Sequence, residues 1–311
     1  MNFNKYDNPK NSLELYELND KFKMLTKLYL SKKIPKVLML SGNKGIGKFT
    51  LINHFLSYIF DKENYDIDKM IINSDTTFYK QYLNNTFPNI LHLSADNFKN
   101  IKIEDVRDLK KQLLKSTISN KERFIILDDI ELFNINSLNA LLKIIEEPSV
   151  NNNFVLINNK TKPLIETIYS RSVELKINLS SEMQISIIDK LVKKNNLELL
   201  IDYKETGLTP GFFLSFNNIL LQNNININED LLINMEKIII LYKKEKRIEL
   251  INLLVFIVDN YFYNLKIKEN RNIDNIMENK NFVLENISKF VSYNLNHNSL
   301  INAINNRLTN G

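Results

Sequence analysis

Residues Gly42 to Thr50 read Gly-Asn-Lys-Gly-Ile-Gly-Lys-Phe-Thr and directly follow the apolar run 37–40. A strand, a glycine-rich turn and a helix in this order point backbone N–H groups inward beside a helix N-terminus. Such a turn suits a triphosphate, and Lys48 is expected to reach its β- and γ-phosphates. The apolar periodicity of residues 50–60 predicts the helix. The stretch therefore predicts a phosphate-binding loop built on Gly42, Gly45, Gly47 and Lys48.

The residue after the loop lysine departs from the usual pattern. A Ser or Thr hydroxyl at that position normally holds Mg²⁺, but here it is Phe49, and the hydroxyl follows one residue later at Thr50. The loop predicts a nucleotide-binding fold with a degenerate site. It leaves open whether ATP binds there and whether Mg²⁺ accompanies it. The alternative interpretation is a glycine turn that joins a strand to a helix and binds nothing.

Composition limits the other classes of function. A chain of 311 residues suits two or three domains. It contains no cysteine, and its three histidines lie far apart, so neither a zinc site nor another metal site is predicted. There is no apolar signal core at the N-terminus, and no run of about 18 uncharged apolar residues predicts a membrane span. We expect a cytoplasmic protein, and its net charge of +5 allows a nucleic-acid partner.

Strand and helix patterns alternate in the first half of the chain. Apolar strands are predicted at 37–41, 89–94, 124–129, 154–159 and 173–177, with helical segments between them. This order indicates an α/β fold with a parallel sheet covered on both faces. Ligands bind such sheets at the carboxyl ends of the strands, where Gly42, Asp128 and Asn158 all fall. Beyond residue 179 the pattern is helical, which divides the chain into 1–179, 180–227 and 228–311.

Two carboxylates end the third of these strands. Asp128 is placed to face a nucleotide-bound Mg²⁺, and Asp129 follows it. In hydrolytic relatives the second residue is a glutamate that activates the attacking water. Asp129 is one methylene shorter, and a misplacement of about an ångström can cost roughly 100-fold in rate. The acidic pair therefore favours weak hydrolysis, and a polar turn that merely ends a strand is the alternative.

Two further stretches resemble one protein family. Residues 136–148, Asn-Ser-Leu-Asn-Ala-Leu-Leu-Lys-Ile-Ile-Glu-Glu-Pro, are similar to a signature of bacterial sliding-clamp loader subunits, and residues 167–172, Thr-Ile-Tyr-Ser-Arg-Ser, resemble their Ser-Arg-Cys motif. Residues 103–109 match the helix that precedes the acidic strand in these AAA+ proteins. The resemblance is strong over 36–178, weaker over 10–35 and only architectural beyond 180. Within the family the chain looks most like the delta-prime class of subunit.

The resemblance implies a role in DNA replication. Clamp loaders are rings of five subunits that open a sliding clamp and close it around primed DNA. By this likeness, 1–179 is an AAA+ P-loop domain, 180–227 a small helical lid and 228–311 a helical collar, and the partners are gamma/tau and delta subunits. Arg171, preceded by Ser170, takes the place of an arginine finger supplied in trans to a neighbour's ATP site. Asn158 takes the place of the residue that senses the γ-phosphate, and Gly211 and Phe212 stand where a lid arginine is expected.

Several alternatives remain beside this interpretation. One is a gamma/tau-like motor subunit with its own ATPase, which would keep the hydroxyl and the glutamate that are missing here. Another is a P-loop kinase, which would need an arginine-rich lid. Arg171 can also be a surface arginine after a helix. Lysine pairs such as Lys110-Lys111 can track DNA phosphates or belong to solvated helix faces.

Overall fold

The computed structural model describes residues 9–95, 101–114, 122–268 and 273–310. By compactness the chain divides into two units: residues 1–197 with 207–214, and residues 198–206 with 215–311. The boundary falls inside helix α9 (Pro210–Gln222). These units do not coincide with the three domains predicted from the sequence, and that three-part division stays a prediction.

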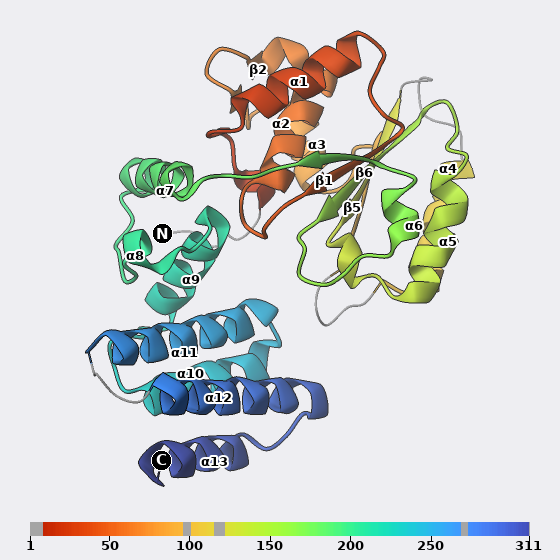
Figure 1. Cartoon of the computed structure of the whole chain (residues 1–311). Helices are drawn as coiled ribbons and strands as arrows, with labels where there is room; N and C mark the ends of the chain where they lie inside the picture. The colour runs from red at the N-terminus through yellow and green to blue at the C-terminus, as the bar shows by residue number, and fades with distance from the viewer. Residues whose placement is uncertain (1–8, 96–100, 115–121, 269–272, 311) are drawn as a thin grey trace. The chain divides into compact units, whose positions relative to one another are not determined.

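The first unit contains a five-stranded parallel sheet in the order β4-β5-β6-β1-β7 (Figure 1). Its strands are β1 (Val37–Ser41), β4 (Ile90–Ser94), β5 (Arg123–Asp128), β6 (Asn152–Asn158) and β7 (Val173–Lys176). The register pairs Ser41 with Asn158 on one side and with Lys176 on the other, while Asp128 pairs with Ser94. The parallel sheet predicted from the sequence is confirmed, and the carboxyl ends of its strands meet along one edge.

Helices cover both faces of this sheet (Figure 1). Alternate residues of β1 point to opposite faces: Leu38 and Leu40 enter one apolar cluster, and Val37 and Met39 enter the other. The first cluster includes side chains of α1 (Asn19–Leu30), α2 (Lys48–Phe60) and α3 (Thr77–Leu83), and the second those of α4 (Ile103–Leu114), α5 (Ile135–Ile145) and α6 (Glu166–Tyr169). Burial on both faces explains why β1 reads as a continuous apolar run rather than an alternating one.

Local signals set several element boundaries. The side chain of Asn134 caps α5 by accepting a hydrogen bond from the Ser137 N–H at 2.8 Å. Helix α7 (Ser181–Asn195) ends at Asn196, which adopts a left-handed conformation with φ 47°. The polar segment 61–88 has no clear pattern; it forms α3 and a short hairpin of β2 (Tyr65–Asp66) and β3 (Ile71–Ile72).

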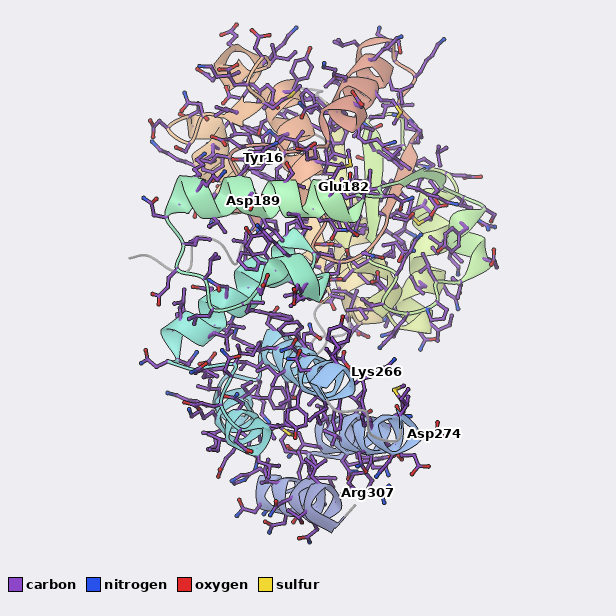
Figure 2. The ribbon with its side chains drawn as sticks, turned by 60° about the vertical axis from the view of Figure 1, so that its left-hand side comes forward. Tyr16, Glu182, Asp189, Lys266, Asp274 and Arg307 are labelled. Carbon is purple, nitrogen blue, oxygen red and sulfur yellow. The ribbon has the colours of Figure 1, made fainter. Side chains whose placement is uncertain are left out.

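Helix α7 is held to the segment that precedes α1. Lys190 Nζ lies 2.6 Å from Glu17 Oε1, and Lys194 pairs with Glu14. Figure 2 shows Tyr16 beside this helix, and the Lys190 ammonium lies 5.8 Å from the centre of the Tyr16 ring. Two ion pairs and a cation–π contact thus join residues that are about 170 positions apart in the sequence.

The second unit is helical. It contains α8 (Tyr203–Thr206), the later part of α9, α10 (Leu231–Glu245), α11 (Ile248–Lys268), α12 (Ile273–Tyr293) and α13 (His297–Asn310). Its core includes Leu253, Leu254 and Val283, which are fully buried, and the ring of Phe216 lies 5.4 Å from that of Phe256. The helical C-terminal region predicted from the sequence is confirmed.

Among the described residues, one stretch, Ile248–Ile267 in α11, is long and apolar enough to cross a membrane by length and composition alone. In its most apolar window, 39% is buried inside the structure. Helix α11 packs against α10 and α12, and core helices of soluble proteins pass the same test, so this signal is weak.

Candidate functional site

The predicted phosphate loop joins β1 to α2, and the ends of two neighbouring strands hold its start. The Gly42 N–H donates to the Asn158 carbonyl at 3.2 Å, and the Ile177 N–H donates to the Ser41 carbonyl at 2.8 Å. Gly42 adopts φ 153°, and a Cβ atom there would lie 2.2 Å from the Ile177 carbonyl oxygen. Only glycine fits this position, because the turn runs directly against the end of β7.

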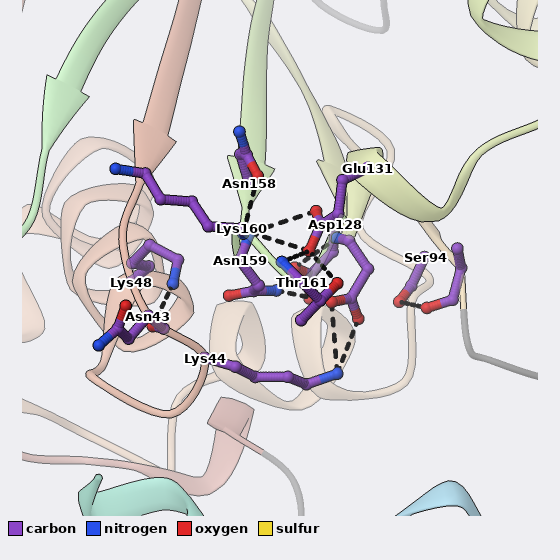
Figure 3. Close-up of polar contacts among 12 residues, drawn as sticks. Asn43, Lys44, Lys48, Ser94, Asp128, Glu131, Asn158, Asn159, Lys160 and Thr161 are labelled. Atoms are coloured by element: carbon purple, nitrogen blue, oxygen red, sulfur yellow. Dashed lines mark hydrogen bonds and ion pairs between the residues drawn. The ribbon is translucent and has the colours of Figure 1, made fainter. Parts of the chain in front are cut away.

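Lys48, the first residue of α2, bonds to its own loop (Figure 3). Its Nζ donates to the carbonyl oxygens of Gly42 at 2.7 Å and of Asn43 at 2.6 Å, and only 3% of the residue is exposed. Burial lowers the pKa of Lys48 to about 8, although the nearby Asp128 acts in the opposite direction. The ammonium is therefore engaged by the loop backbone and pays a desolvation cost there.

Phe49 belongs to the apolar core. Its side chain is 7% exposed, and the centre of its ring lies 5.1 Å from that of His92 on β4. The position that carries the magnesium-binding hydroxyl in the usual motif thus serves packing in this chain. Thr50 is half-buried and lies one residue further along α2, a rotation of roughly 100° around the helix axis.

The two aspartates at the end of β5 have different surroundings. Asp128 accepts a hydrogen bond from the Asp129 N–H at 2.9 Å, and burial, with the Asp129 charge as a second cause, raises the pKa of Asp128 to about 7. Asp129 has a left-handed backbone with φ 52° and is 7% exposed. Its carboxylate lies 3.3 Å from the Lys44 ammonium and accepts a hydrogen bond from the Asn159 amide at 2.6 Å. Asp129 is thus tied to the phosphate loop and to the end of β6.

A third carboxylate, that of Glu131, lies beside these aspartates and was not singled out in the sequence analysis (Figure 3). It is 5% exposed and accepts from the Asn159 N–H at 3.1 Å and from the Thr161 hydroxyl at 2.8 Å. The signal was a charged residue between two apolar ones, Ile130 and Leu132. Lys44, Asn159, Glu131 and Thr161 therefore join Asp129 in one hydrogen-bonded network across the ends of β1, β5 and β6.

Asn158 is the last residue of β6, and its side chain bonds to residues outside the Asp129–Glu131 network. Its amide nitrogen donates to the Tyr169 hydroxyl at 3.0 Å, and its oxygen accepts from the Lys160 N–H at 2.9 Å. Only 1% of the residue is exposed. The structure thus connects Asn158 to α6, two residues before Arg171.

Arg171 follows α6 on the surface, and Ser170 caps that helix. The Ser170 hydroxyl donates to the Thr167 carbonyl at 3.1 Å and accepts from Arg171 Nη1 at 3.2 Å. On its other edge the guanidinium contacts Glu146, the residue that ends α5. The two family-like stretches, 136–148 and 167–172, therefore meet through the side chains of Glu146 and Arg171.

Helix α9 begins directly against the phosphate loop. The Gly211 N–H donates to the Gly45 carbonyl at 2.8 Å, and the Thr209 hydroxyl donates to the Lys44 carbonyl at 2.9 Å. The segment that was predicted to lack a lid arginine thus makes backbone contacts with the loop. Within the described residues, no group of three or more His, Cys, Asp or Glu side chains is arranged to hold a metal ion.

The parallel sheet, the glycine-rich loop after β1, the acidic end of β5 and the helical C-terminal region define an α/β protein with a phosphate-loop-like turn and a helical C-terminal region. The chain belongs to the family described as DNA polymerase III, delta subunit, whose sequence model matches residues 18–181, more than half of the chain. This is a family of clamp loader subunits.

Individual relatives carry the names of more than one subunit. The chain is 26% identical over 200 residues to DNA polymerase III subunit gamma of Buchnera aphidicola subsp. Acyrthosiphon pisum (strain APS), which covers 63% of this chain and 53% of the relative. It is 36% identical over 76 residues to DNA polymerase III subunit delta' of Pseudomonas aeruginosa, which covers 24% of this chain and 23% of the relative. The chain thus spans about half or less of these curated relatives.

Among solved structures, a DNA polymerase III gamma subunit-related protein from Thermotoga maritima is similar over 90% of this chain and 96% of its own. The sequence identity is 18%, and the TM-score is 0.48.

Proposed function

We propose that this chain is a delta-prime-like subunit of the DNA polymerase III clamp loader, that it hydrolyses little ATP itself, and that Arg171 acts as an arginine finger on a neighbouring ATPase subunit. Its partners are gamma/tau and delta subunits, and the assembled complex binds the sliding clamp and primed DNA. The protein acts in the cytoplasm. Family membership supports the assembly, and the finer assignments rest on the residues of the site.

The proposal rests mainly on the burial of Asp129 and on the contacts of its carboxylate. This carboxylate stands where hydrolytic relatives have the water-activating glutamate, yet it is 7% exposed and held by Lys44 and Asn159. A general base must reach the proton that it removes. The Asp129 carboxylate is buried and oriented by Lys44 and Asn159, so it is poorly placed to activate a water molecule.

The residues of the loop also fit a magnesium nucleotide poorly. Lys48 donates to two loop carbonyls, Phe49 supplies no hydroxyl, and Gly45 is in backbone contact with Gly211. A phosphate could be bound by Lys48 only if its ammonium left these two carbonyl oxygens. We therefore assign no catalytic step to this site and propose that ATP turnover occurs on the neighbouring subunits.

The test compares the isolated chain with the complex. The purified chain should show turnover well below about 1 s⁻¹, whereas typical enzymes turn over at about 10 s⁻¹. In a complex reconstituted with gamma/tau and delta subunits, Arg171→Ala should leave assembly intact and reduce ATP hydrolysis stimulated by clamp and primed DNA. Arginine fingers are worth roughly 10³–10⁵ at the site that they serve, and the loss for the whole complex is smaller because the other sites keep their fingers.

A gamma/tau-like motor subunit is the second candidate, because gamma and tau subunits are among the relatives. It predicts substantial ATPase activity in the isolated chain that Lys48→Ala abolishes. If the Arg171→Ala complex assembles fully and its stimulated ATPase activity is unchanged, Arg171 is not an arginine finger. The ATPase activity of the isolated chain and that of the Arg171→Ala complex are independent measurements. The first tests whether this chain hydrolyses ATP, and the second tests the role of Arg171.

A further inference from the structure

Glu146 contacts the guanidinium of Arg171 through one carboxylate oxygen. Arg171 Nε donates to Glu146 Oε1 at 2.7 Å, and Nη2 lies 2.6 Å from the same oxygen. Glu146 belongs to the end of α5 and Arg171 to the turn after α6, so the pair joins two separate segments. Both side chains are partly exposed, at 34% for Arg171 and 45% for Glu146.

The opposite side of the guanidinium is held by the segment of Arg171 itself. Nη1 lies 3.1 Å from the Thr167 carbonyl oxygen and 3.2 Å from the Ser170 hydroxyl. An arginine side chain has five N–H donors in a rigid plane. Contacts to Glu146, Thr167 and Ser170 account for up to four of them, and the remaining donor is on Nη2. The side chain is thus fixed on two sides and keeps a donor for another group.

The position of Glu146 is electrostatically unusual. The C-terminal end of a helix carries a partial negative charge and favours a cation, yet Glu146 caps α5 there with a carboxylate. Arg171 supplies the compensating charge. The neighbouring Glu147 is also exposed but is no part of the contacts that hold Arg171.

We infer that Glu146 is the positioning residue for Arg171: it fixes the orientation of the guanidinium before the neighbouring subunit docks. This inference rests on the proposed role of Arg171 as a finger. A long, free arginine side chain samples many rotamers, and ordering it at the moment of reaction costs entropy. Glu146 and the Thr167–Ser170 turn order it in advance, so that a γ-phosphate meets a donor already in place.

Glu146 could instead mask Arg171, in which case Glu146→Ala would raise the rate of ATP hydrolysis rather than lower it. A carboxylate that withheld Arg171 from a phosphate would have to compete with a more highly charged group. An exposed ion pair is worth too little for that, but it suffices to select one rotamer of a side chain whose Nη1 is already held. Positioning is therefore the reading that the contacts favour.

The experiment uses the full chain in a reconstituted clamp loader complex with saturating ATP, primed DNA and clamp. Glu146→Ala should lower kcat of the affected site by roughly two- to fivefold, which corresponds to the loss of an exposed ion pair worth up to about 1 kcal/mol. Glu146→Gln keeps an oxygen that can accept from Nε, so its rate should lie between those of Glu146→Ala and the wild type. Glu147→Ala is the matched control and should leave the rate unchanged. Melting temperature and assembly are measured on the same preparations.

A double-mutant cycle separates positioning from a structural role. If Glu146 acts through Arg171, Glu146→Ala should cause no further loss in a chain that already carries Arg171→Ala. A full additional loss in that background, a rate unchanged by Glu146→Ala, or a rate increased by it would each overturn the inference. Arg171→Ala without effect would instead defeat the proposed finger, which the same experiment reports separately.

Discussion

The Gly211 N–H donates a hydrogen bond of 2.8 Å to the carbonyl oxygen of Gly45, so the first turn of α9 lies against the middle of the phosphate loop. The two backbones leave no room for a side chain at either glycine. A Cβ atom added at Gly211 would lie 2.7 Å from the Cα of Gly45, and one added at Gly45 would lie 2.4 Å from the Thr209 hydroxyl. Glycine at both positions is therefore a requirement of this contact.

Gly211→Ala should destabilise the protein by about 1–3 kcal/mol, the range typical of overpacking. In the absence of the contact, alanine would favour the helix by about 1 kcal/mol over glycine, so the sign of the stability change shows whether the contact is present. Thermal unfolding measures this change. Gly207→Ala is the comparison, since Gly207 has φ +63° and no atom within 4 Å of an added Cβ, which leaves only backbone strain of about 1–2 kcal/mol. A stabilised Gly211→Ala protein would show that the loop and α9 are not in contact.

Phe49→Ser should restore the hydroxyl of the usual motif without restoring ATPase activity. The substitution empties a site that is 7% exposed in the core, at a cost of about 3–5 kcal/mol on the scale of buried phenylalanine truncations. Asp129 stays tied to Lys44 and Asn159, so the general base is still missing. Phe49→Leu, which keeps an apolar side chain, should cost much less. Appreciable ATP turnover in the serine variant would contradict this account of the site.

Asn159→Ala should destabilise the protein because it removes the 2.6 Å hydrogen bond to the buried Asp129 carboxylate. Hydrogen bonds to charged groups are worth about 1.5–3 kcal/mol. The measurement is the free energy of unfolding by denaturant, with Asn306→Ala, on an exposed helix position, as the control expected within about 0.5 kcal/mol of wild type. Equal effects of the two substitutions would mean that the contact carries no stability.

Asp128→Asn should stabilise the protein at alkaline pH and lose that advantage in acid. Burial raises the pKa of Asp128 from 3.8 to about 7, so between these values the folded state binds more protons than the unfolded state. The free energy of unfolding therefore falls as pH rises through this window, and above about pH 7 the full cost of the buried charge is present. The asparagine has no charge to bury and can still accept from the Asp129 N–H.

Thermal unfolding over a pH series checks the sign of this effect. At about pH 8 the melting temperature of Asp128→Asn should exceed that of wild type by about a few degrees, and the two should converge towards about pH 4. Asp108→Asn is the matched control, because its side chain is 64% exposed on α4 and paired with Lys111. A variant less stable than wild type at pH 8 would show that the Asp128 charge is favourably held.

The sequence predicted those parts of the fold that depend on local patterns. Strand β1 was predicted at its observed bounds because every one of its residues is buried, and helix α2 follows from its apolar periodicity. The hairpin β2–β3 and helix α3 were not predictable in this way, since they are short and lie in a largely polar segment. Their place in the fold depends on core contacts of aromatic side chains such as Phe78 and Tyr82.

The residues of the candidate site were likewise predictable only where they belong to local sequence motifs. Gly42, Lys48 and Asp128 stand out in the sequence because each belongs to a recognisable motif at the carboxyl end of a strand. The partners that determine their chemistry do not: Lys44 meets Asp129 across 85 positions, and Glu131 meets Asn159 across 28. A missing arginine was all that the sequence indicated at Gly211, whereas the contact with Gly45 depends on how α9 packs onto the loop.

The position of β1 in the sheet also has a consequence for biosynthesis. Both of its neighbours are encoded far downstream, at residues 154–158 and 173–176. At a translation rate of roughly 5–20 residues per second, the ribosome needs about 7 to 27 s to proceed from Ser41 to Lys176. Through most of that interval the apolar strand lacks both of its neighbours, and such long-range pairing is slow once it begins. The nascent chain is therefore a natural client for chaperones during synthesis, and the loop takes its folded shape only after more than half of the chain has been made.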